Sequence, residues 1–306
     1  MKNRLGMRMS GGPTAQAQDQ VHDLPEIEGV EHRFVDADGL RVHVAEAGDG
    51  PPVLLLHGWP QHWYMWRGVI ERLAPQFRLI APDLRGFGWT EAPGDGYDAN
   101  TFAADQIALL DALEIESASV IGHDWGGWTA FLLALDYPDR IERMVICNTP
   151  HPWPRIEPSL LLETWRSWYA IANASPLLGR WLAQSSRIPG FFLSHGNVHD
   201  PFADGLEIYL RQFRDPARAQ ASMKLYRYYL RIFIAGLRGG AYRGKRLGTP
   251  TLLLFGAADR WVSTRLLPGY EQHADDMQLE MVPDSGHFLV DEKPDLVARR
   301  ALAFLS

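Results

Sequence analysis

Short apolar runs alternate with amphipathic stretches through the first half of this chain. Residues 32–36 and 40–44 each alternate apolar and polar positions around Asp38-Gly39, which predicts a β-hairpin. Further runs are almost wholly apolar, as is typical of strands covered on both faces of a parallel sheet. These runs are residues 53–56, 78–81, 118–121 and 143–147.

Amphipathic segments fill the intervals between these runs. Apolar residues recur at helical spacing in residues 63–73, in residues 100–113, and in a helix expected to begin just after Gly126-Gly127. Strands and helices that alternate in this way predict a mostly parallel central sheet flanked by helices.

The alternation of strands and helices ends at residues 149–154, a segment rich in proline. From there to about Gly248 no strand-like run occurs, and the segment is helical and aromatic, with Trp168 and Trp181 among its rings. We expect a helical cap inserted after the sixth strand, although aromatic residues at this spacing are also typical of ordinary core. The sheet resumes at residues 251–255 and 278–282, and an amphipathic helix closes the chain.

We therefore expect a disordered N-terminal tail at residues 1–24, a core of residues 25–149 and 248–306, and a cap of residues 150–247. The 306 residues are 46% hydrophobic, enough for a large core. A net charge of −7 argues against nucleic acid or an anionic membrane as a partner. The tail lacks the apolar segment of a signal peptide and no run is long enough to cross a bilayer, so we expect a cytoplasmic protein.

The strand at residues 118–121 runs into Gly122-His123-Asp124-Trp125-Gly126-Gly127. Glycines two positions before and two and three positions after Asp124 suit a nucleophile elbow, in which a sharp turn pushes one side chain into a cleft. The elbow usually carries serine, and here Asp124 takes its place. The alternative is an ordinary turn in which Asp124 caps the following helix.

Two further polar residues follow strands later in the chain. Asp259 comes after the strand at 251–255, and His287 comes after the strand at 278–282. With Asp124 they stand in the order nucleophile, acid, base that is typical of the α/β-hydrolase fold. Among rival acids, Asn148 carries no charge, and Asp284 lies too near His287 in sequence to approach it from behind.

The loop His57-Gly58-Trp59-Pro60 follows the strand at 53–56. In this fold it supplies the second backbone N–H of an oxyanion hole, and the residue after the nucleophile supplies the first. Those donors are expected to be Trp59 and Trp125, and the following proline favours a cis bond.

At these motifs the chain resembles the α/β-hydrolase-fold epoxide hydrolases, over about residues 28–306. The resemblance rests on His-Gly-Trp-Pro, Gly-His-Asp-Trp-Gly-Gly, Asn-Thr-Pro-His-Pro-Trp at residues 148–153, and Gly286-His287. It implies that two cap tyrosines hold and protonate the epoxide oxygen: Tyr169 in a Trp-Tyr pair, and Tyr226 before an arginine, with Tyr229 on nearly the same helical face as an alternative. We expect the substrate pocket to be lined by His57, Pro60, His151, Trp153 and Tyr229.

An aspartate nucleophile predicts substitution at saturated carbon. Serine would form a stable ether there, whereas a carboxylate forms an ester on Asp124 that water can cleave. His287, oriented by Asp259, is then expected to activate that water. The electrophile is an epoxide or a halide.

Departures from related families favour the epoxide. Haloalkane dehalogenases typically place asparagine where Trp59 stands, and fluoroacetate dehalogenases place arginines where this chain has Trp125 and Trp128. A non-catalytic ligand receptor would not need a water-activating base. We therefore predict an ether-bond hydrolase acting on a mostly apolar epoxide and water, and leave a homodimer open. We expect no cofactor, because the sequence contains no Gly-rich phosphate loop. We expect no metal, because Gly196 and Asn197 make the stretch with His195, His199 and Asp200 a loop.

Overall fold

The computed structural model describes residues 24–155, 157, 163, 165–166, 168–176, 178–202, 205–237 and 242–306. The tail expected at residues 1–24 lies outside this part of the chain apart from Leu24, which packs against the core. Parts of the predicted cap also lie outside it, namely residues 156, 158–162, 164, 167, 177, 203–204 and 238–241.

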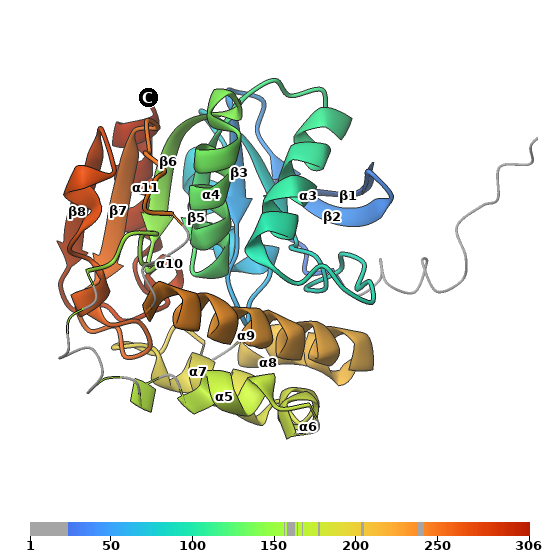
Figure 1. Ribbon diagram of the computed structural model, residues 1–306. Coiled ribbons are helices and arrows are strands. Elements are labelled where there is room, and N and C mark those ends of the chain that lie inside the picture. Colours follow the sequence, from blue (N-terminus) through green and yellow to red (C-terminus); the bar gives the residue numbers. More distant parts are fainter. Residues whose placement is uncertain are drawn as a thin grey trace, which may run out of the picture.

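One sheet of eight strands organises the described residues, in the order β1-β2-β4-β3-β5-β6-β7-β8 (Figure 1). The hairpin strand β2 runs antiparallel to β1 and β4, and the remaining pairs are parallel. Every predicted strand is found. The strands are β1 (Glu31–Ala37), β2 (Leu40–Ala47), β3 (Pro52–Leu56), β4 (Arg78–Pro82), β5 (Ala118–His123), β6 (Ile141–Cys147), β7 (Thr251–Gly256) and β8 (Met277–Val282).

Helices cover both faces of the sheet, which is why its central strands are apolar throughout. In β3, Leu54 packs into the cluster formed with helices α3 (Ala99–Ala112) and α4 (Trp125–Asp136), and its neighbour Leu55 packs into the opposite cluster with α11 (Pro294–Leu305). Side chains alternate between the faces of a strand, so a strand buried on both sides needs no polar positions. Figure 1 shows α3 and α4 on one face.

The remaining helices agree with the predicted pattern, with two differences. The segment 63–73 begins as a 3₁₀ turn, η2 (Trp63–Trp66), and continues as α2 (Arg67–Leu73). Helix α4 begins at Trp125, before the Gly126-Gly127 pair and not after it, because the glycines let the first helical turn pack closely on β3. Short elements complete the core: η3 (Pro138–Arg140), η6 (Thr264–Leu266), η7 (Tyr270–Gln272) and α10 (Leu289–Glu292).

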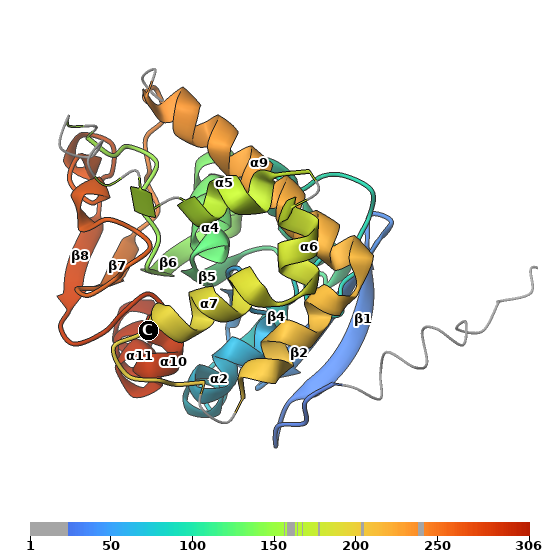
Figure 2. The ribbon, with the colours of Figure 1, turned by 90° about the horizontal axis from the view of Figure 1, so that it is seen from below.

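The helices that lie between β6 and β7 in the sequence form a layer that crosses one end of the sheet (Figures 1 and 2). Helices α5 and α6 pack on the long helix α9. Ring contacts join this layer to the loop after β3, since Phe192 and Tyr226 lie 5.1 Å and 4.9 Å from the Trp59 ring. We propose that it is the predicted cap. Its elements are α5 (Trp168–Ala174), α6 (Leu178–Gln184), α7 (Arg187–His195), α8 (Leu206–Leu210), η5 (Arg211–Arg214) and α9 (Pro216–Leu237).

Within the described residues, no helix combines the length and apolar content needed to cross a bilayer.

Burial keeps three histidines neutral in the folded protein. Desolvation lowers the pKa of His62 to about 4, that of His123 to about 3 and that of His151 to about 4. In the unfolded chain the same groups bind protons below about pH 6.5. The unfolded state therefore binds more protons than the folded state between about pH 6.5 and pH 4.

We predict that the free energy of unfolding falls as the pH is lowered from 7.5 to 5, by about 2 kcal/mol for each of these histidines. Asp124 opposes the trend by about 1 kcal/mol, because its raised pKa of about 6 favours the folded state as it protonates. The raised pKa values of His287, Asp291 and Asp105 act in the same direction as that of Asp124. Denaturant titrations at both pH values measure the difference. Replacing His62 by glutamine should reduce it. A stability that is flat or rises toward pH 5 would contradict this explanation.

Candidate active site

Asp124 occupies a sharp turn between β5 and α4. Its backbone lies at φ 49° and ψ −117°, a conformation that costs energy for a residue with a side chain. The surrounding glycines allow the turn: a Cβ on Gly126 would lie 2.0 Å from the carbonyl oxygen of Leu56, and one on Gly122 would lie 2.8 Å from the Cα of Gly127. Asp124 makes no side-chain capping hydrogen bond, so the interpretation as a helix cap is wrong.

The loop after β3 reaches the carboxylate of Asp124. The backbone N–H of Trp59 donates to Asp124 Oδ2 at 2.9 Å, and the backbone N–H of Trp125 lowers the pKa of the same carboxyl group. A Cβ on Gly58 would lie 2.4 Å from the Cβ of Asp124, so only glycine allows this approach. The Trp59–Pro60 peptide is cis, as predicted. The two expected oxyanion donors therefore point at one carboxylate.

The environment of Asp124 works against its charge. Desolvation raises the pKa of the carboxyl group to about 6, although His287 and the two backbone N–H groups act in the opposite direction. Near neutral pH the carboxylate is still ionised, but it is poorly solvated. Such a group is a stronger nucleophile than a carboxylate in water.

His287 and Asp259 form a buried pair beside Asp124. The Nδ1–H of His287 donates to Asp259 Oδ2 at 2.8 Å, while Asp259 Oδ1 accepts the backbone N–H groups of Trp261 and Val262. The other ring nitrogen of His287, Nε2, is buried and has no partner among the described residues. It is the atom that can accept a proton.

Electrostatics fit this arrangement. Burial alone would lower the pKa of His287, but the charges of Asp259 and Asp124 and the hydrogen bond to Asp259 outweigh it, and the pKa is raised. Burial would raise the pKa of Asp259, but His287 and the other donors outweigh it, and the pKa is lowered. An imidazolium that forms at His287 is therefore stabilised where it forms.

Sequence reasoning missed the role of Asn148. This fully buried residue follows β6 with a positive φ of 48°, and its Nδ2 donates to Asp259 Oδ2 at 2.8 Å and to the carbonyl oxygen of Gly286 at 3.1 Å. In the sequence, Asn148 stands out only as a rival acid, and it carries no charge. Its place directly after β6, on the rim that carries Asp124 and Asp259, was the signal that could have identified it.

Two buried tyrosines from the helical layer interact electrostatically with Asp124. The rings of Tyr169 in α5 and Tyr226 in α9 are 5.6 Å apart, and the Tyr226 ring lies 6.5 Å from that of Trp125. Burial first, and then neighbouring charges including Asp124, raise the pKa of each hydroxyl well above 10. Both groups therefore stay protonated. Tyr229 is only partly buried, with its ring 6.2 Å from that of Trp125.

Three of the expected pocket residues form hydrogen bonds with backbone groups. His57 accepts the N–H of Leu84 and donates to Gly58, and His151 donates to Leu267 at 2.6 Å and accepts the N–H of Trp153. The Trp153 indole donates to the Tyr242 carbonyl. We propose that His57, His151 and Trp153 support their loops through these bonds.

Pro60 is buried, and its carbonyl oxygen accepts Gln212 Nε2 at 2.9 Å. Aromatic rings pack on the His287 ring and on one another. Phe192 and Phe288 contact His287, while Trp59 contacts Phe192, Tyr169 contacts Phe192 and Tyr226, and Trp125 contacts Tyr226.

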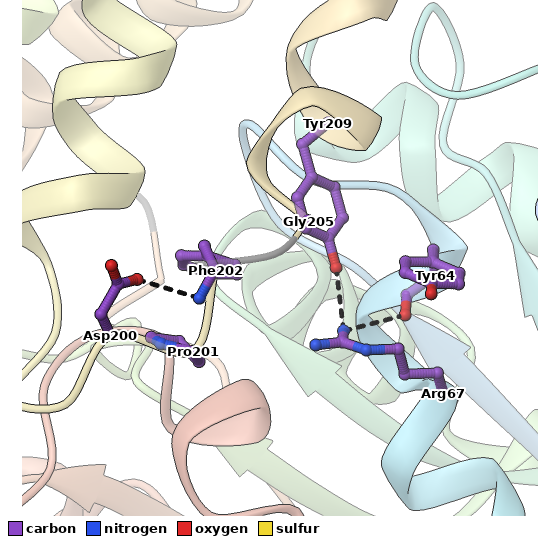
Figure 3. A pocket seen from close by; sticks show the side chains of 7 residues that line it. All are labelled: Tyr64, Arg67, Asp200, Pro201, Phe202, Gly205 and Tyr209. Carbon is purple, nitrogen blue, oxygen red and sulfur yellow. Dashed lines mark hydrogen bonds between the residues drawn. The ribbon is translucent and has the colours of Figure 1, made fainter.

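A separate hollow of about 230 Å³ lies between α2 and α8 (Figure 3). There Arg67 donates to the Tyr209 hydroxyl, the Tyr64 carbonyl and Asp291. No predicted site residue lines it.

His199 pairs with Asp284 and His195 with the carbonyl of Phe191, and no group of three potential metal ligands converges within the described residues.

Comparison with known proteins places this geometry in a family. A family model described as alpha/beta hydrolase fold matches residues 51–294. A soluble epoxide hydrolase from Corynebacterium sp. (strain C12) is 32% identical over 90% of this chain and 98% of its own length. A fluoroacetate dehalogenase from Burkholderia sp is 29% identical over 91% of this chain and 95% of its own length.

The solved structure of the epoxide hydrolase CorEH without ligand superposes with a TM-score of 0.79 and 31% identity, over 90% of this chain and 98% of that one. The strand order, the aspartate elbow and these similarities agree with one another. The chain belongs to the α/β-hydrolase-fold family and, within it, to the group of the epoxide hydrolases.

Proposed function

We propose that this protein is an epoxide hydrolase that converts an epoxide to a vicinal diol through an ester on Asp124. The observation that carries the proposal is the pair of buried tyrosines Tyr169 and Tyr226, whose rings are 5.6 Å apart and whose hydroxyl pKa values are raised by burial and by charges that include Asp124. Epoxide opening produces an alkoxide, which needs a proton donor in a site from which water is excluded.

In the first step, an oxygen of Asp124 attacks a carbon of the epoxide ring. The carbon–oxygen bond breaks, its electron pair stays on the oxygen, and Tyr169 or Tyr226 protonates that oxygen. A carbon–oxygen ester bond joins the product to Asp124. The enzyme needs no base here, because Asp124 with its pKa of about 6 is already ionised at neutral pH.

In the second step, Nε2 of His287 takes a proton from water as the water oxygen adds to the ester carbonyl. The backbone N–H groups of Trp59 and Trp125 stabilise the resulting oxyanion. Collapse of this intermediate breaks the ester bond, and the imidazolium protonates the departing alkoxide to release the diol. The new carboxyl group of Asp124 loses its proton, which restores the tyrosine.

The alternative is a dehalogenase with the same nucleophile. The similarity to a fluoroacetate dehalogenase supports this alternative. One contact favours the epoxide. The Trp59 indole N–H donates to Ser222 Oγ at 2.8 Å. A protein group thus occupies this donor, whereas a leaving halide requires donors that are free for it. A ligand receptor would have no use for the Nε2 of His287.

We predict diol formation from styrene oxide and from an aliphatic epoxide, and no halide release from 1-bromobutane or fluoroacetate. The aromatic walls of the site favour the aryl substrate, since apolar pockets bind apolar ligands. Chromatography of diols and an ion-selective electrode for halide measure the two outcomes. Halide release without diol formation would establish the dehalogenase instead. Turnover of no compound would support the receptor.

We predict that Tyr169→Phe and Tyr226→Phe each slow ring opening, and that the double variant nearly abolishes it. One hydroxyl can still donate in each single variant, whereas the double variant loses a general-acid contribution of about 100- to 10,000-fold. Single-turnover alkylation by styrene oxide is the measurement. Tyr229→Phe is the matched control on the same helix and should stay near the wild-type rate. If Tyr229→Phe proved the sensitive variant, the second proton donor would be Tyr229 and not Tyr226.

A further inference from the structure

We propose that Glu292 is a positioning residue that holds the backbone of the His287 loop and couples it to the loop after α7. The inference rests on the proposed function, because the step that it concerns is ester hydrolysis by water activated at His287. Glu292 is the last residue of α10, and its carboxylate lies between two loops that are far apart in sequence.

Both oxygens of Glu292 accept backbone N–H groups. Oε1 accepts the N–H of Gly286 at 2.8 Å, and Oε2 accepts those of Val198 at 3.0 Å and His199 at 3.2 Å. Hydrogen bonds to an ionised carboxylate are shorter and stronger than those between neutral groups. One side chain therefore joins the residue just before His287 to the loop that leaves the helical layer.

A direct contact between the two loops lies beside this carboxylate. The N–H of His287 donates to the carbonyl oxygen of Gly196 at 2.7 Å, and a Cβ on Gly286 would lie 2.1 Å from that same oxygen. Glu292 bonds to Gly286 in one loop and to Val198 in the other, so its bonds flank this contact in both loops. Moving either loop would therefore move the peptide that carries His287.

The other polar groups of this peptide are also engaged. His123 Nε2 donates to the carbonyl oxygen of His287 at 2.9 Å, and Asn148 donates to that of Gly286. Among the N–H groups, that of Gly286 depends on Glu292. Loss of the Glu292 carboxylate would leave this peptide held only by the bonds to the carbonyl oxygens of His287 and Gly286 and by the contact with Gly196. A misplacement of about 1 Å in a reacting group can cost about 100-fold in rate.

The chain offers a matched control in the same two loops. His199 pairs with Asp284 at 2.8 Å, and both side chains are exposed, at 62% and 64%. This pair also links the loop after α7 to the segment before His287. Exposed ion pairs contribute little, so its removal tests whether any link between the loops suffices or whether the Glu292 contacts are required.

The experiment measures alkylation and ester decay separately, by single-turnover quenching with styrene oxide, in wild type, Glu292→Gln and Asp284→Asn. Glutamine keeps the shape but replaces one acceptor oxygen by an amide that cannot accept an N–H. We expect ester decay to slow about 10- to 100-fold in Glu292→Gln while alkylation stays within about threefold. Asp284→Asn should change neither step by more than about twofold.

The pH profile of ester decay provides a second readout. The groups that face His287 are Asp259, Asp124, His123 and Glu292, and the Glu292 charge contributes to raising the pKa of His287. Removing that charge should lower this pKa. Since His287 must be neutral to accept a proton, the acidic limb of the profile should move to lower pH in Glu292→Gln. A loss of packing alone would not produce this shift.

Several outcomes would overturn the inference. Unchanged ester decay in folded Glu292→Gln, equal slowing of both steps, or the same effect in Asp284→Asn would each do so. If Glu292→Gln does not accumulate as folded protein, Glu292→Asp takes its place and should show the same selective loss by a smaller factor. A wild-type chain without epoxide turnover would overturn the proposed function together with this inference, whereas the first three outcomes in an active enzyme leave the proposed function intact.

Discussion

The rest of the structure depends on how the carboxylate of Asp124 is held ionised in a site that excludes water. Desolvation raises its pKa to about 6, and the N–H groups of Trp59 and Trp125 and the charge of His287 limit that rise. The turn that presents Asp124 is possible because Gly126 packs against the backbone of β3. A larger side chain at that position would separate the helix from the sheet and remove the N–H donors from the carboxylate.

The parallel sheet brings the remaining groups to this carboxylate. The chain leaves β5 at Asp124, β6 at Asn148, β7 shortly before Asp259 and β8 shortly before His287, and these strands are neighbours in the sheet. Carboxyl ends of parallel strands share one rim, where open α/β sheets place their ligand sites. Residues 111 apart in sequence, Asn148 and Asp259, therefore form a direct hydrogen bond.

The sequence predicted those features of the fold and of the site that depend on a few adjacent residues. The strands are apolar runs, the elbow is a pattern of glycines around Asp124, and the cis bond follows from Pro60, so each was predicted from a few adjacent residues. The roles of His57 and His151 were not predictable in this way, because each depends on a backbone group more than 25 residues away. The contacts of Glu292 with Val198 and His199 have the same cause, since no local pattern indicates a partner 94 residues distant.

The central claim is that Asp124 forms a covalent ester that His287 then helps to hydrolyse, and trapping that ester tests it most directly. His287→Gln should still be alkylated by styrene oxide, because Asp124 needs no base, but the ester should persist. Mass spectrometry of the digested variant should show the added mass of the epoxide on the peptide that contains Asp124, and on none in Asp124→Asn. An adduct on another peptide, or a wild-type rate in Asp124→Asn, would contradict the account.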